Sequence, residues 1–187
     1  LLVRLTANCR HRTRLQTECA LAPFKKPMID QLDTCEYLYL RSIEEPEERS
    51  LRLVLEEARS SDESEDLEIG GVTVGPVHRI GHDSKCRVFE VLWSTYISYA
   101  VTNESYQLPE DPGAFSGRRV RRYTRSAFLE FVARSTFASS DYPGPFEHIG
   151  LICLNHGIDV VSTEAPHVQL LRPGKPRLFQ ELDPKHS

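Results

Sequence analysis

The sequence predicts an α+β domain, in which a mostly antiparallel, strongly curved sheet or β-sandwich of about seven strands is closed at one end by one principal helix. Over 86–106, apolar and polar side chains alternate around Trp93, the only tryptophan, as they do in a half-buried strand. After Met28, only 126–137 repeats its apolar residues at convincing helical spacing. Because the connections are short and helices do not alternate with strands, antiparallel pairing is favoured.

The first half of the folded part predicts two strands and an acidic loop. The segments 35–43 and 51–58 are predicted as strands, although the glutamates at the end of the second also suit a helix. The run 59–68 holds five acids and three serines, and almost nothing in it can be buried. We interpret it as a solvated loop rather than a cation site, because it lacks the turn glycine of a calcium loop.

Glycine and proline mark the next breaks. Within 67–80, Gly70-Gly71 predicts a bend and Gly75-Pro76 a second break. The alternating stretch 86–106 exceeds the ~3 to 10 residues of one strand, so a bulge or kink is expected between Ser94 and Ser98.

The second half predicts the helix and the last strands. Ser126 is a suitable N-cap for the helix, whose apolar stripe is formed by Phe128, Leu129, Val132 and Ala133. The segment 146–155 is apolar on both faces, which predicts a central strand. Four further elements are a loop at 107–117, a short strand or helix approach at 118–124, and short strands at 158–162 and 168–171.

Length and charge predict one domain with a separate basic leader. At 187 residues and 40% hydrophobic, the chain is sufficient for a single core, expected over 28–172, with a flexible tail at 173–187. Residues 1–27 carry six basic side chains and one acidic one, a balance of +5 that leaves −9 for the rest of a chain with net charge −4. Because the only methionine is Met28, we expect translation to start there and the leader to lie outside the fold.

The five cysteines favour a reduced, cytoplasmic protein. They are odd in number and widely spread, without a CxxC pair or histidine at zinc spacing, so neither a disulfide framework nor a metal site is predicted. No apolar run approaches the ~20 residues of a membrane helix, and no membrane association is expected. No cofactor is expected either, because Gly-rich phosphate loops are absent from the sequence.

Several segments together resemble a known family. They are WSTYISYAVTNES at 93–105, the 117–123 segment leading to SAFLEFV, STFASSDYPGPFEHIGLICLNH at 135–156, and DVVS at 159–162. In this pattern, W-x-x-Y-I-x-Y-x-V-x-N-E-S followed by G-P-F-x-H-x-G-x-x-C-L-N-H, the chain is similar to a family of small uncharacterised bacterial proteins. The resemblance covers most of the chain after Met28 and implies a bacterial origin, but no activity, cofactor or partner.

An arginine patch is the first candidate site. Five arginines interleave with an aromatic residue within eight positions: Arg118, Arg119, Arg121, Arg122 and Arg125, with Tyr123. Such a patch can neutralise phosphates while tyrosine stacks on a base, which is typical of RNA or single-stranded DNA binding. However, the acidic balance of the folded part favours internal ion pairs over nucleic acid.

A second constellation has the residue types of a cysteine hydrolase: His148, Cys153, Asn155, His156 and Asp159. On a continuous strand, Cys153 would point away from His148 and His156, so a thiol–histidine pair would need another histidine such as His78 or His82. A packed core cysteine, histidines bonded to backbone, and a turn at Asp159 are the simpler interpretations.

From these observations we expect a non-enzymatic module that binds a protein partner or acts as an adaptor, with Tyr96 as one exposed-looking aromatic on its sheet. The alternatives are a hydrolase-like enzyme that uses Cys153 or the histidines, and an RNA-binding protein that uses the arginine patch. A bare edge strand could also pair with a second copy of the chain, which would form a homodimer.

Overall fold

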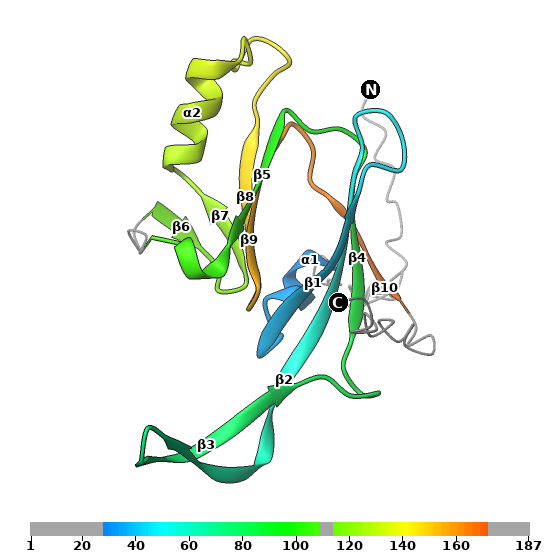
Figure 1. The fold of residues 1–187 in the computed structure, drawn as a ribbon. Helices are drawn as coiled ribbons and strands as arrows, with labels where there is room; N and C mark the ends of the chain where they lie inside the picture. Colours follow the sequence, from blue (N-terminus) through cyan, green and yellow to red (C-terminus); the bar gives the residue numbers. More distant parts are fainter. Residues whose placement is uncertain (1–27, 109–113, 172–187) are drawn as a thin grey trace, which may run out of the picture.

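The computed structural model describes residues 28–108 and 114–171, and the leader and tail predicted from the sequence lie outside these ranges. Two antiparallel sheets make up most of it (Figure 1). The first has the order β1-β2-β4-β10, with β3 paired to the outer part of β2, and the second has the order β5-β9-β8-β7-β6. The elements of the first sheet are β1 (Tyr37–Glu44), β2 (Leu51–Ile69), β3 (Val72–Gly81), β4 (Val88–Trp93) and β10 (His167–Leu171).

The second sheet carries the principal helix. Its strands are β5 (Ser98–Asn103), β6 (Phe115–Ser116), β7 (Val120–Tyr123), β8 (Glu147–Ile152) and β9 (His156–Ser162). The helix α2 (Ala127–Ser135) lies on the face that points away from the first sheet (Figure 1). Two short elements complete the described chain: α1 (Ile29–Leu32) and the 3-10 turn η1 (Glu104–Tyr106). The predicted α+β, sheet-rich fold is thus confirmed.

The two sheets share one hydrophobic core. In the strands that face one another, alternate residues point inward, so Leu53, Phe89 and Val91 of the first sheet form one cluster with Ile149, Leu151 and Ile158 of the second. Trp93 is 1% exposed and belongs to the same cluster. In the described part of the chain no helix is long and apolar enough to cross a membrane.

The long alternating stretch passes from one sheet to the other. Strand β4 ends at Trp93 and β5 begins at Ser98, so the expected kink between Ser94 and Ser98 is a break at which the chain changes sheets. The expected central strand is also present, because β8 pairs with both β7 and β9. It ends at Ile152, earlier than predicted, and the chain reverses over 153–155 into β9.

The interpretation of 59–68 as a loop is wrong. Strand β2 continues through this run to Ile69 and pairs with β3, and the hairpin projects from the body of the molecule (Figure 1). Its turn consists of Gly70 and Gly71, whose φ values of 61° and 81° suit a two-residue hairpin turn. Because both faces of the hairpin are largely solvated, no apolar alternation is needed there, and the polar sequence hides the strand.

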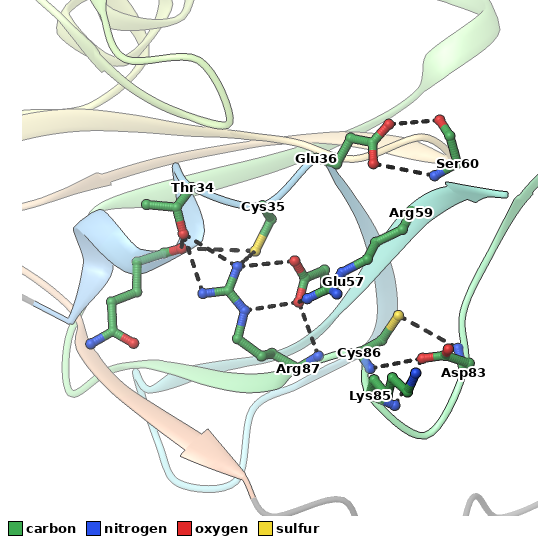
Figure 2. Close-up of polar contacts among 11 residues, drawn as sticks. Thr34, Cys35, Glu36, Glu57, Arg59, Ser60, Asp83, Lys85, Cys86 and Arg87 are labelled. Atoms are coloured by element: carbon green, nitrogen blue, oxygen red, sulfur yellow. Dashed lines mark hydrogen bonds and ion pairs between the residues drawn. The ribbon is translucent and has the colours of Figure 1, made fainter. Parts of the chain in front are cut away.

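A buried ion pair lies at the base of this hairpin (Figure 2). The Glu57 carboxylate, 2% exposed, accepts hydrogen bonds from Arg87 Nε at 2.8 Å and Arg87 Nη2 at 3.0 Å, and from Arg59 at 3.2 Å. Burial acts to raise the pKa of Glu57, but the hydrogen bonds from Arg87 and Arg59 hold it at about 2. Arg87 also donates to Thr34 and to the Cys35 thiol, which joins the α1–β1 connection to the first sheet.

Candidate functional site

The outer face of the second sheet carries a cleft of about 590 Å³. It lies where the last strands of the sheet meet the beginning of α2, and its lining combines apolar, hydroxyl and charged side chains. Its lining includes Arg121, Tyr123, Arg125, Ser126, Ala127 and Asp159.

A serine, a histidine and an aspartate form a continuous hydrogen-bonded chain at this cleft. The distance from Ser126 Oγ to His148 Nδ1 is 2.8 Å, and the distance from His148 Nε2 to Asp159 Oδ1 is also 2.8 Å. Ser126 and Asp159 line the cleft, and the His148 ring joins them from beneath. We call this chain of Ser126, His148 and Asp159 the relay.

The strand register explains why these three residues meet. Gly150 lies opposite Asp159, and His148 lies two residues before Gly150, so the histidine and the aspartate share one face of neighbouring strands. Tyr123 lies opposite His148 at the end of β7, and three residues later the chain turns into α2. Ser126 is therefore brought back over the histidine.

The direction of the hydrogen bonds follows from chemistry. An ionised carboxylate only accepts, so the nitrogen facing Asp159, Nε2, carries the ring proton. Nδ1 is then the basic nitrogen, and the Ser126 hydroxyl donates to it. In serine hydrolases, too, the serine donates to the histidine and the histidine donates to the aspartate. There, however, Nε2 faces the serine and Nδ1 faces the aspartate.

Packing fixes the histidine ring. His148 is 2% exposed and stacks on Tyr123, with a centroid distance of 4.2 Å and an interplanar angle of 12°. Phe128 of α2 covers another side, at a centroid distance of 5.5 Å. The imidazole is therefore held in one orientation between Ser126 and Asp159, as a general base must be.

Ser126 is also the N-cap of α2, as predicted. Its extended backbone (φ −163°, ψ 159°) places Oγ where it accepts from Leu129 N at 3.0 Å. The N–H groups of Ala127 and Phe128, in the first turn, have no acceptor within the helix, and the positive end of the helix dipole lies there. A negative charge that develops beside Ser126 Oγ would therefore be stabilised at this end of α2.

The structure divides the arginine patch. Arg118 and Arg119 donate to backbone carbonyls of Cys35 and Glu36, and Arg122 pairs with Asp30 at 3.1 Å. These three arginines hold the α1–β1 segment against the second sheet. The other members of the patch, Arg121, Tyr123 and Arg125, line the cleft.

Cys153 is not poised for nucleophilic chemistry. Its side chain belongs to the core, at 3% exposure, and burial raises the pKa of its thiol to about 12. His156 begins β9, and its Nδ1 is buried without a hydrogen-bond partner among the described residues. Within 28–108 and 114–171, no group of three His, Cys, Asp or Glu side chains could hold a metal.

The sequence indicates His148 and Asp159 as candidate residues, but it does not connect either of them with Ser126. The prediction of one continuous strand over 146–155, with Asp159 in a turn, is wrong and hides the pairing of β8 with β9. A hairpin turn recognised at Leu154-Asn155 would have placed His148 and Asp159 on one face.

Comparisons of the chain with family models, with curated proteins and with solved structures find no match.

Proposed function

We propose that this chain is a serine-dependent hydrolase that cleaves ester or thioester bonds in the cleft beside α2. The observation that carries the proposal is the relay, in which a fixed histidine accepts from the hydroxyl of Ser126 and donates to Asp159. Acyl transfer needs an activated nucleophile, an oriented base and a stabilised oxyanion. The relay supplies the first two, and the amides at the start of α2 are placed to supply the third.

In the proposed reaction, His148 Nδ1 carries the proton between Ser126, the leaving group and water. Ser126 Oγ attacks the carbonyl carbon while its proton passes to His148 Nδ1, and Asp159 stabilises the imidazolium. When the tetrahedral intermediate collapses, Nδ1–H protonates the leaving alkoxide or thiolate, and an acyl-serine remains. Water then attacks the acyl-serine, with Nδ1 again taking and returning the proton, so one ester and one water become one acid and one alcohol.

The test separates catalysis from helix capping. Ser126→Ala removes both the nucleophile and the cap, whereas Ser126→Asn keeps an acceptor for Leu129 N and loses only the hydroxyl. Using p-nitrophenyl acetate and butyrate, we expect both variants to lose at least ~10³-fold in kcat/KM, with Asp159→Asn losing a similar factor. If Ser126→Asn hydrolyses these esters at the wild-type rate, the proposal fails.

The second candidate function is a protein-binding or adaptor module, as expected from the sequence. The observation that favours it is the hairpin of β2 and β3, which projects beyond the sandwich and carries exposed aliphatic side chains. Binding a partner is compatible with hydrolysis at the other sheet. For location we propose the bacterial cytoplasm, a proposal supported by the free thiols of Cys35, Cys86 and Cys153.

A further inference from the structure

The projecting hairpin, residues 59–81, which we call the arm, is a two-stranded ribbon beyond the sandwich (Figure 1). Strand β1 begins opposite Ala58 and β4 begins opposite Glu56, and neither reaches further along β2, so along the arm β2 pairs only with β3. Two strands alone are marginal, and unpaired edges are templates for another strand. The arm therefore has the geometry of an incomplete sheet.

One face of the arm's tip is aliphatic. Leu67 lies opposite Val74 and Ile69 lies opposite Val72, so the four side chains share one face. Their exposed fractions are 40%, 44%, 63% and 62%, in that order. On the other face Glu68 lies opposite Thr73, so the tip is amphipathic.

Of the two edges, that of β2 is the one open to a new strand. On β3, Pro76 lacks an N–H and interrupts the donors that a partner strand would need. On β2, the Glu36 carboxylate occupies the base of the edge, where it accepts from Ser60 N at 3.2 Å and Ser60 Oγ at 2.6 Å. The Ser61 hydroxyl accepts from Glu63 N at 3.0 Å. Pairing with β3 resumes at Ser64 and, after an irregularity between Glu65 and Leu67, is regular over 67–69, so the stretch left for a partner strand is 64–69.

The negative charge of the arm indicates what kind of segment it binds. The arm carries Asp62, Glu63, Glu65, Asp66 and Glu68 against Arg59 and Arg79, a balance of −3. Within the described chain, only Glu65 of these five acids takes part in an ion pair, with Arg79 at 2.5 Å. The arm of a second copy would bring a like charge. In addition, Leu67, Ile69, Val72 and Val74 are already about half covered, so burying them fully would offset little of the cost of association.

We infer that the arm binds an extended, basic segment of a partner protein, which adds as a strand along 64–69 of β2. Main-chain hydrogen bonds supply affinity, aliphatic side chains at alternate positions of the segment cover Leu67 and Ile69, and its basic residues meet Asp66 and Glu68. This inference deepens the second candidate function and does not depend on Ser126.

The experiment uses the full chain and defined peptides in a fluorescence anisotropy titration. The probe is a nine-residue peptide that alternates lysine and valine, and its controls replace lysine by glutamate or N-methylate alternate amides. We expect the basic peptide to bind at least ten times more tightly than either control, with the affinity falling as salt rises. Equal binding of the N-methylated peptide would rule out strand addition, and equal binding of the acidic peptide would rule out charge selection.

Variants of the arm locate the site. Glu68→Lys and Ile69→Ser lie at exposed positions and are each expected to weaken binding about tenfold, whereas Glu48→Lys, an exposed acid outside the arm, is the matched control. Unchanged binding by both arm variants, or a dimer that these variants dissociate, overturns the inference. Ester hydrolysis by the arm variants and peptide binding by Ser126→Asn are measured in parallel, so that failure at one site is distinguished from failure at the other.

Discussion

Replacing Glu57 by glutamine is expected to lower the free energy of unfolding by about 3 kcal/mol at pH 7. The carboxylate is 2% exposed and accepts from Arg87 Nε, Arg87 Nη2, the Arg87 amide and Arg59. Glutamine has nearly the same shape, but it removes the negative charge that compensates two guanidinium groups at the base of the arm. The main effect is therefore electrostatic rather than a loss of packing.

The magnitude follows from the pKa. The pKa of Glu57 is about 2 in the folded chain and 4.5 for an unperturbed glutamate. At ~1.4 kcal/mol per pKa unit, this difference stabilises the folded state by about 3 kcal/mol wherever the carboxylate is ionised in both states. Because the folded pKa is the lower one, this contribution is complete above about pH 5 and is lost as the pH falls toward 2.

The assay is urea unfolding of the wild type and Glu57→Gln at pH 7 and at about pH 3, followed by circular dichroism. The difference between the two proteins is expected to be about 3 kcal/mol at pH 7 and less than half of that at about pH 3. Other acids titrate in both proteins and cancel, and Glu48→Gln, an exposed substitution, controls for the loss of any negative charge. A difference that stays constant with pH, or that is below 1 kcal/mol at pH 7, would refute the reasoning.

Three other predictions concern the body of the sandwich. Asp33→Ala should lower the free energy of unfolding by about 2 kcal/mol in the same assay, because one carboxylate oxygen accepts from the amides of Arg118, Arg119 and Val120; stability like that of the wild type would contradict this. Gly150→Ala should leave the fold intact and reduce ester hydrolysis at least tenfold, because a Cβ there would lie 2.8 Å from the Tyr123 ring that stacks on His148; full activity would show that the stacking is dispensable. Cys153→Ala should cost about 1 kcal/mol of stability and leave hydrolysis unchanged, because the buried thiol has a pKa of about 12; loss of activity in a folded variant would return the thiol to the mechanism.

The fold was predictable where burial imposes a pattern. In β4 the inward residues are apolar at every second position, and in α2 the stripe containing Val132 has helical spacing, so both were found from the sequence. The arm was missed because a hairpin exposed on both faces needs no apolar alternation, and its acids mimic a solvated loop. The helix α1 was missed because four residues are too few to show a period.

The candidate site was predictable only in part, because it depends on register. Tyr123, His148 and Asp159 are brought together by the pairing of β7, β8 and β9. The register of β8 with β9 depends on where the chain turns between them, and that of β7 with β8 depends on the chain that returns through α2. Ser126 was found for its cap, a local property, but its contact with His148 spans 22 residues. Local patterns carry no information about such a contact until the strands are paired.

The most direct test of the proposed activity is the intact mass of the chain after treatment with a fluorophosphonate, which phosphonylates activated serines. The relay predicts a single adduct, mapped by peptide mass spectrometry to Ser126, that is absent from Ser126→Asn and strongly slowed in His148→Asn. Folded wild-type protein that stays unlabelled, or that carries the adduct on another residue, would contradict the account and leave Ser126 as a helix cap alone.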